Sequence, residues 1–133
     1  MTTMTSQASS QTSLPPLASR FVEVAGLPWE KTRFAGVETK TLLVDRATGV
    51  CTSLVKMAPG ARLPDHEHVL IEQTYVVEGS LVCGEGECKA GDFVWRPAGS
   101  RHEAWGGAQG GVMLAIFQVP NRFYEADQTA QHQ

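Results

Sequence analysis

Residues 60–79 read GARLPDHEHVLIEQTYVVEG and contain the pattern on which both fold and chemistry depend. His66 and His68 are two residues apart, so on an extended chain their side chains point to the same face, with Cα atoms roughly 6.6 Å apart. Two imidazoles at this spacing can converge on one ion, each about 2.1 Å from it. Glu72 opens residues 72–78, a run with strong strand character, and can place a carboxylate beside the imidazoles.

A second stretch carries another histidine. A His-x-His pattern alone can be an accident of a surface strand, so this second stretch decides between the two interpretations. Residues 91–102 read GDFVWRPAGSRH, a strand followed by a Pro-x-Gly turn and His102. Of the chain's 4 histidines, only His132, in a polar tail, lies outside the two stretches. The pattern therefore favours a metal site.

The two stretches resemble the paired motifs of the cupin superfamily. The first motif is Gly, five residues, His-x-His, three residues, Glu, six residues, Gly; the second is Gly, five residues, Pro-x-Gly, two residues, His. Every motif position is present, at Gly60, His66, His68, Glu72, Gly79, Gly91, Pro97, Gly99 and His102. One departure is Gly106, where the second motif usually ends in Asn; this Asn is not a metal ligand in the pattern.

The resemblance implies an all-β fold, a jelly-roll barrel (double-stranded β-helix) with the metal inside. Many short strands, turns roughly every 8–12 residues and no convincing helix independently favour a closed sandwich or barrel. The compact layout is similar to the cupin domain of the anti-sigma factor ChrR and to small bacterial cupin dioxygenases, such as those cleaving β-diketones. Residues 1–19 are too short and polar to replace the sigma-binding domain of ChrR, which disfavours sigma-factor regulation.

Length and composition indicate one domain without nucleic-acid or membrane partners. The chain has 133 residues and a net charge of −3, with no run of Lys or Arg. No apolar run approaches the ~20 residues needed to span a bilayer, and the start lacks a signal peptide. The 3 cysteines contain no Cys-x-x-Cys pair, so we expect reduced thiols in a cytoplasmic protein.

The order of the predicted elements follows from composition and turn signals. Residues 1–19 are polar, and we expect a disordered segment or an interface arm. Residues 20–124 are predicted to form the cupin domain and residues 125–133 a polar tail. Predicted strands are residues 20–24, 37–44, 50–57, 72–78, 81–83, 87–89, 92–96 and 112–119, with a glycine-rich hairpin loop at 106–111.

The ligand set His66, His68, Glu72 and His102 mixes nitrogen and oxygen donors. Such a set suits one divalent transition metal ion, with Fe(II) favoured and Zn, Mn, Ni or Cu as alternatives, and does not suit Ca or Mg. Two histidines and a carboxylate on one face leave positions for O2 and substrate, and a fourth protein ligand still leaves two in an octahedral ion. Glu72 is also predicted to be catalytic, because its charge tunes the ion.

Strand alternation predicts which other side chains line the pocket. Thr74 and Val76 share parity with Glu72, and Arg62 shares parity with the two motif histidines and could bind an anionic substrate. On later strands, whose register the sequence does not define, the candidates for lining the pocket are Phe93, Trp95, and either Phe117 or Gln118.

Three classes of function fit these residues. The leading hypothesis is an Fe(II) dioxygenase acting with O2 on a small organic substrate. The alternatives are a non-catalytic Zn-binding sensor or binding protein, and a metal-dependent isomerase or lyase that polarises a carbonyl. The substrate itself is not encoded in the motifs.

The sequence also predicts a homodimer. The strand expected at residues 20–24 would present an unpaired edge, with Trp29 and Phe34 adding apolar surface beside it. Closed two-fold dimers commonly cover such surfaces, and small cupins often pair this way. We expect the segment from about Leu14 onward to pack across the interface.

Overall fold

The computed structural model describes residues 14–118 and 122–123, so most of the predicted disordered segment and the polar tail at 125–133 lie outside the described residues. The described part contains nine strands and one 3₁₀ turn, η1. The elements are η1 Val24–Gly26, β1 Glu30–Lys31, β2 Val37–Asp45, β3 Val50–Met57, β4 Arg62–Glu67, β5 Glu72–Cys83, β6 Gly86–Lys89, β7 Phe93–Arg96, β8 Arg101–Gln118 and β9 Arg122–Phe123. Among these residues, no helix has the length and apolar character needed to cross a membrane.

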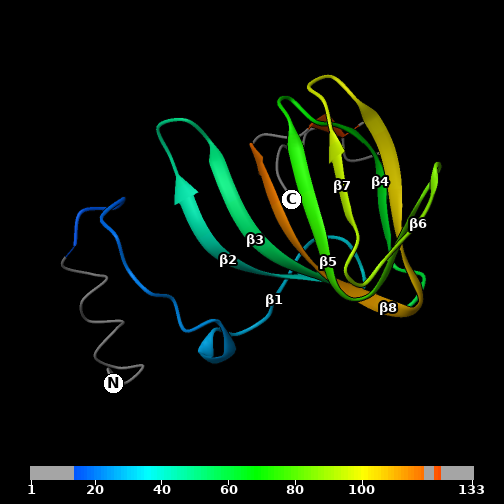
Figure 1. Cartoon of the computed structure of the whole chain (residues 1–133), viewed down its shortest axis with the longest axis horizontal. Helices are drawn as coiled ribbons and strands as arrows, with labels where there is room; N and C mark the ends of the chain where they lie inside the picture. Colours follow the sequence, from blue (N-terminus) through cyan, green and yellow to red (C-terminus); the bar gives the residue numbers. More distant parts are fainter. Residues whose placement is uncertain (1–13, 119–121, 124–133) are drawn as a thin grey trace.

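The long strand β8 organises the sheet. One edge of β8 pairs with β5, while the other pairs with β3 in its C-terminal half and with β4 in its N-terminal half. β6 and β7 add to the far edge of β5, β1 and β2 extend from β3, and β9 pairs with β4. All pairings are antiparallel, and the sheet rolls into the predicted all-β jelly-roll barrel (Figure 1).

The predicted hairpin at residues 106–111 is wrong, because β8 runs through these glycines without turning back. The glycines instead allow close strand approach. A Cβ on Gly106 would lie 2.3 Å from the carbonyl oxygen of Ala58, and one on Gly111 would lie 2.5 Å from that of Ser80. Along β8, the glycines therefore allow close backbone contact where the strand passes from pairing with β4 to pairing with β3.

The other predicted strands were found, with one exception. Residues 37–44 and 50–57 form the β2–β3 hairpin, and residues 81–83 and 87–89 form the β5–β6 hairpin. Residues 20–24 form no strand; Arg20 instead hydrogen-bonds back to the carbonyl of Ala18, and a backbone bond from Gly26 to Glu23 begins η1. These turns divert the segment from the sheet. The short strands β1 and β9 were not predicted.

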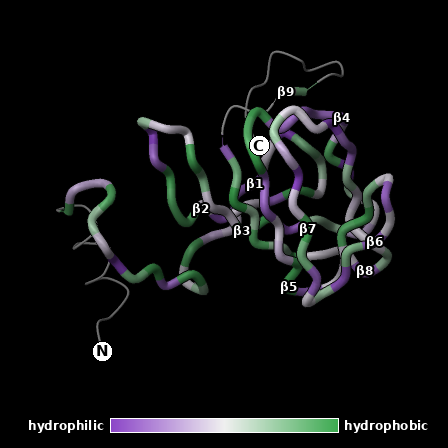
Figure 2. Tube along the Cα trace, turned by 45° about the horizontal axis from the view of Figure 1, so that its top comes forward, coloured by the Kyte–Doolittle hydropathy of each residue, from purple (hydrophilic) through white to green (hydrophobic). Residues whose placement is uncertain are grey.

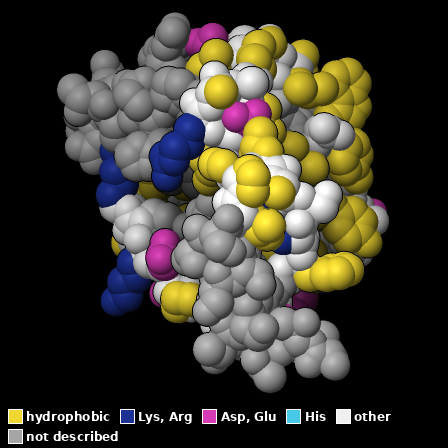
Figure 3. Space-filling model, turned by 90° about the vertical axis from the view of Figure 1, so that its left-hand side faces the viewer, with side chains coloured by type: hydrophobic (Ala, Val, Ile, Leu, Met, Phe, Trp, Pro, Cys, Tyr) yellow, Lys and Arg dark blue, Asp and Glu magenta, His cyan; other side chains and the backbone are white. Residues whose placement is uncertain are grey.

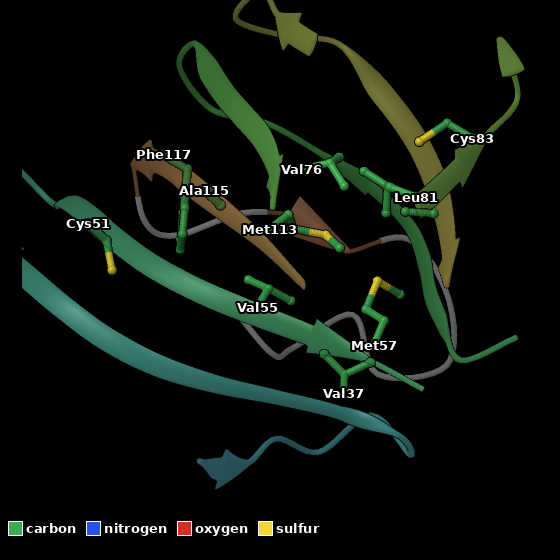
Figure 4. Close-up of a cluster of buried hydrophobic side chains, with 11 residues drawn as sticks. Val37, Cys51, Val55, Met57, Val76, Leu81, Cys83, Met113, Ala115 and Phe117 are labelled. Atoms are coloured by element: carbon green, nitrogen blue, oxygen red, sulfur yellow. The ribbon is translucent and has the colours of Figure 1, made fainter. Parts of the chain in front are cut away.

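The core occupies the interior of the barrel. β3 alternates half-buried and buried residues, and Val55 and Met57 on its inner face meet Val76 and Met113 from β5 and β8 (Figure 4). Hydrophobic and hydrophilic segments occur on the same strands (Figure 2). The alternating burial along β3 is the period-two pattern of a strand with one buried face.

The outer surface contains an apolar area that we call the outer apolar face. Its residues are exposed by 37–58% and come from β2, β5, β7 and β8, namely Leu43, Tyr75, Phe93, Trp95 and Ile116. Apolar side chains also crowd the right-hand side and top of the view in Figure 3. Extended sheet faces of this kind are uncommon on monomers.

The N-terminal arm, residues 14–23, extends away from the barrel (Figure 1). Its side chains Leu17 and Phe21 are 58% and 91% exposed. Trp29 is half-buried, with the ammonium groups of Lys40 and Lys56 at 4.9 and 4.6 Å from its ring centroid. Phe34 does not add to an exposed edge, because it packs against the core and stacks on Phe123.

Candidate metal centre

Two strand connections bring the three motif histidines together. His66 on β4 and His102 on β8 are cross-strand partners. His68 follows β4, where its backbone N–H donates to the carbonyl of Ser100 (3.0 Å) and its carbonyl accepts from the N–H of Gly99 (2.8 Å). The Pro-x-Gly turn between β7 and β8 therefore fixes the chain at His68.

The imidazoles form a compact buried cluster that can hold a metal ion. One ring nitrogen from each of His66, His68 and His102 lies within 4.8 Å of those of the other two. The Nε2 atoms of His68 and His102 are 2.9 Å apart. His66 and His68 are only 3% and 1% exposed. Such proximity of three nitrogens in a buried site is typical of a cation site.

Backbone hydrogen bonds select the ring nitrogen that each of two histidines presents. Nδ1 of His66 donates to the carbonyl of Pro64 at 2.7 Å, and Nδ1 of His102 donates to the carbonyl of Glu103 at 3.2 Å. With Nδ1 protonated, the Nε2 lone pairs are left for an ion. Metal-ligating histidines are commonly oriented by such second contacts.

Glu72 brings the carboxylate to this cluster. It is the first residue of β5, opposite Arg96 on β7. Its Oε1 lies 3.1 Å from Nε2 of His68 and 4.0 Å from Nε2 of His102. The carboxyl group thus approaches the cluster beside the imidazoles.

Burial sets the protonation of the ion-free site. Desolvation lowers the pKa of His66, and it lowers the pKa of His102 to about 3, with the charge of His66 contributing further. Both rings are therefore neutral near pH 7, the form that binds metals. Desolvation raises the pKa of Glu72 to about 7, although Arg96 opposes the shift. A divalent cation would reverse this shift, because it stabilises the carboxylate.

The cluster adjoins an interior cavity that we call the inner chamber. Its volume is about 50 Å³, and His66, Glu72 and His102 line it. A larger hollow of about 500 Å³ is lined by residues that include Gly36 and Gln109 and by none of the three histidines. The inner chamber is the cavity that His66, Glu72 and His102 line together.

Comparison with known proteins identifies the family. The model of the ChrR cupin-like domain matches residues 18–121. The chain belongs to the ChrR cupin-like family. No curated protein sequence matches it.

Solved structures share the cupin fold at low sequence identity. A candidate acetylacetone dioxygenase from Methylibium petroleiphilum PM1 is similar, with TM-score 0.75, 18% identity and 88% of each chain covered. An acetylacetone dioxygenase from Acinetobacter johnsonii has TM-score 0.74 at 15% identity, covering 89% of this chain and 86% of that one. The polyketide cyclase RemF from Streptomyces resistomycificus has TM-score 0.66 at 20% identity, covering 84% and 89%. At these identities the likeness concerns the fold.

Two predicted pocket residues line the inner chamber of this cupin. Thr74 and Phe117 both face it and are buried. Val76 is fully buried but belongs to the core rather than to the chamber lining. Gln118 lies at the end of β8, where its amide donates to the carbonyl of Thr48 at 2.5 Å, outside the chamber.

Arg62 and Trp95 do not occupy the predicted interior positions. The β4–β8 ladder shifts register between Leu63 and His66, so parity counted back from His66 fails at Arg62. Arg62 instead forms an ion pair with Glu103. Trp95 pairs with Gln73 on the outer side and is 58% exposed, and Phe93 is exposed by 53%. The inward residues of β7 are Val94 and Arg96.

The sequence analysis missed two residues beside the cupin site. Arg96 is 7% exposed and lines the inner chamber. Phe123 on β9 is 4% exposed and stacks on His66, with ring centroids 5.0 Å apart. The pairing of Glu72 with Arg96 would have indicated the first residue, but only once the β5–β7 register was known.

Proposed function

We propose that this cupin is a metal-dependent enzyme, an Fe(II) dioxygenase that acts on a small organic substrate. His66, His68, Glu72 and His102 would hold the ion. The observation that carries the proposal is the proximity of three imidazoles, with one nitrogen of each of His66, His68 and His102 within 4.8 Å of the others, beside a cavity, and a Glu72 carboxylate oxygen 3.1 Å from His68. When bound, the ion supplies Lewis acidity and redox chemistry.

The donor set supports a transition metal ion in the site. Three imidazoles and one carboxylate suit a divalent ion such as Fe(II), Mn, Ni or Zn. An ion that takes six ligands, such as Fe(II), would keep two positions for O2 and substrate beside these four residues.

The size of the inner chamber supports a small substrate. About 50 Å³ admits only a group of a few atoms beside the ion. Structural likeness to acetylacetone dioxygenases makes a small dicarbonyl compound the first substrate to test, with O2 as co-substrate. Glu72 would tune the ion by its negative charge.

Oxygen uptake by reconstituted protein tests this function. Protein purified without oxygen would be loaded with Fe(II) and mixed with acetylacetone and O2. We expect O2 consumption to match loss of the diketone, and we expect Zn-loaded protein and His68→Ala to be inactive. Absence of O2 uptake across a panel of small dicarbonyl compounds, with Fe(II) bound stoichiometrically, would exclude the dioxygenase proposal.

A redox-free reaction is the second candidate, favoured by the likeness to a polyketide cyclase. In an isomerase or lyase the ion would only polarise a carbonyl. Turnover under argon with Zn-loaded protein would identify this class. Zn bound without turnover of any tested compound would instead favour a sensor or binding protein.

We also propose that the protein acts as a cytoplasmic homodimer. Its three cysteines are free thiols, which suits a reducing compartment. The outer apolar face and the N-terminal arm support association with a second copy.

A further inference from the structure

A second cavity lies against the inner chamber and shares part of its wall. This outer hollow, next to the β5–β6 hairpin, has a volume of about 390 Å³ and is open to solvent. Leu81, Val94 and Arg96 line both the inner chamber and the outer hollow. The Arg96 side chain therefore stands at the partition between the candidate metal centre and a larger space.

Arg96 is held at this partition by an ion pair with Glu85. Its Nη1 and Nη2 donate to the carboxylate oxygens of Glu85 at 2.5 and 3.4 Å. The side chain of Arg96 is 8% exposed, whereas that of Glu85, on the β5–β6 turn, is 67% exposed. An exposed carboxylate on a turn is an easily replaced partner, since water solvates it when it leaves. The buried guanidinium keeps its charge and its need for an acceptor.

We propose that Arg96 and the outer hollow form the substrate-recognition site of this protein, and that they select a small monoanion with a neutral, apolar tail. The inference rests on the proposed metal centre and extends it to the substrate class. The anionic head would enter the inner chamber and accept hydrogen bonds from Arg96 in place of Glu85. The tail would remain in the outer hollow.

The charges of the site favour a single negative charge on the ligand. The imidazoles are neutral, so a divalent ion with ionised Glu72 leaves one positive charge. Arg96 adds a second positive charge, and the Glu85 carboxylate, which still lines the outer hollow after its hydrogen bonds are exchanged, offsets that charge. One monoanion then brings the site to neutrality, and a guanidinium binds carboxylate or enolate oxygens through paired hydrogen bonds.

The lining of the outer hollow favours a neutral tail. Its apolar residues include Leu81, Cys83, Cys88, Phe93 and Val94. Burial raises the pKa of the Cys83 and Cys88 thiols, so both stay uncharged near pH 7.

Acidic side chains surround this apolar wall. Glu85, Glu87 and Asp92 also line the outer hollow. The hydrogen bond from Arg96 lowers the pKa of Glu85, which therefore remains ionised. A second anionic group at the tail end of a ligand would meet these carboxylates and be repelled.

Calorimetric titration of Zn-loaded protein with four matched probes tests the proposal without turnover. Hexanoate has the predicted head and tail, hexanamide a neutral head, hexanedioate a second anion, and acetate no tail. We expect hexanoate to bind about tenfold or more tightly than each of the other three. Equal affinity for hexanoate and hexanamide would overturn the anionic head, and equal affinity for hexanoate and acetate would overturn the tail site.

Three variants assign these preferences to residues. Arg96→Gln should lower the affinity for hexanoate about tenfold and leave the affinity for hexanamide unchanged. Cys88→Phe fills the outer hollow, so it should lower the affinity for hexanoate and leave the affinity for acetate unchanged. Arg46→Gln, an exposed arginine on the β2–β3 turn that lines neither cavity, is the control for loss of one positive charge. Undiminished hexanoate binding by Arg96→Gln would overturn the role of Arg96.

Glu85→Gln keeps the proposal testable if Arg96→Gln does not fold. Removing the competing carboxylate should raise hexanoate affinity severalfold, and a fall in affinity would contradict the exchange of partners. If the protein binds no metal, the proposed metal centre fails by itself. The same titrations on metal-free protein must then still show an Arg96-dependent preference for hexanoate over hexanamide, and its absence would overturn the recognition site.

Discussion

His66 and His102 are register partners across the β4–β8 ladder, although the preceding pair, Leu63 and Ala104, is three residues away on β4 and two on β8. The additional residue in β4 turns Leu63 and His66 to the same side, and both line the inner chamber. A bulge of this kind re-aims side chains beside a site. The irregularity therefore places the first motif histidine opposite the third.

Removal of one imidazole should remove most of the metal. His66→Ala, His68→Ala and His102→Ala should each lose most bound ion and remain folded, because the core cluster does not include these residues. Metal-to-protein ratios and circular dichroism would measure both effects. His132→Ala, outside the described residues, is the matched control and should retain the ion. Full metal occupancy in His68→Ala would contradict the proposed site.

A bound ion should also stabilise the fold. At ~100 times its dissociation constant, the ion adds roughly 2.7 kcal/mol to the free energy of unfolding. A chelator should therefore lower the melting temperature of the wild type and have little effect on His68→Ala. An unchanged wild-type melting temperature after verified metal removal would count against an ion in the folded protein.

Ionisation of Glu72 should make the ion-free protein less stable as pH rises. Its pKa is raised to about 7 by burial, against 4.5 for an ordinary glutamate. Between these values the folded state keeps a proton that the unfolded state has lost, so this contribution is complete below pH 4.5 and is lost through pH 7. His102, whose pKa is lowered to about 3, acts in the opposite sense and loses its contribution as pH falls from 6.5.

Glu72→Gln isolates the first contribution, because glutamine does not ionise and His102 is common to both proteins. Relative to wild type, the metal-free variant should gain up to about 3 kcal/mol of unfolding free energy between pH 4.5 and pH 8. Urea denaturation in chelator at several pH values would measure the difference. A difference independent of pH would show that Glu72 has an ordinary pKa. In metal-loaded protein, Glu72→Gln should lose less metal affinity than the histidine variants do. It should lose more of its activity than of its metal affinity.

Gly79 should be among the least replaceable positions of the barrel. Its φ is +64°, and a Cβ would lie 2.1 Å from the carbonyl oxygen of Gly110. Gly79→Ala must therefore move backbone and should lower the free energy of unfolding by roughly 3 kcal/mol or more. Gly84→Ala, on the β5–β6 turn with no atom within 4 Å of a Cβ, is the control and should change stability by less than about 1 kcal/mol. Equal denaturation midpoints for the two variants would contradict this steric argument.

The sequence predicts the features that depend on local spacing. The jelly-roll fold and the β2–β3 and β5–β6 hairpins follow from motifs, alternation and turn residues. The structure brings His66, His68 and His102 together as the spacing predicts.

The features that depend on register were not predictable. Arg62 was predicted to face the pocket by counting alternate residues across a β-bulge, and no residue type in the sequence indicates this bulge. The side to which Trp95 points depends on the pairing of β5 with β7, which the sequence does not define. The glycines at 106–111 resemble a turn, but serve close packing within one strand. Arg96 was missed because its inward orientation depends on the β5–β7 register, and no local sequence feature indicates that orientation.

Two exposed apolar surfaces favour association of two chains. Leu17 and Phe21 on the N-terminal arm are exposed, and the outer apolar face on the barrel is exposed as well. Burying these surfaces against each other in a two-fold pair would remove both from water. We therefore expect the full-length protein to be a dimer at micromolar concentration, as measured by light scattering.

Variants on each surface distinguish the ways in which the dimer could form. Trp95→Ser combined with Phe93→Ser should give a monomer, because both side chains lie on the outer apolar face. Leu70→Ser, which removes an exposed leucine outside that face, is the control and should remain dimeric. A chain beginning at Trp29 lacks the arm and should dimerise more weakly. If that shortened chain dimerises as strongly as the full-length protein, the outer apolar face forms the interface and the arm does not contribute. If the full-length protein is a monomer at micromolar concentration, the dimer prediction is wrong.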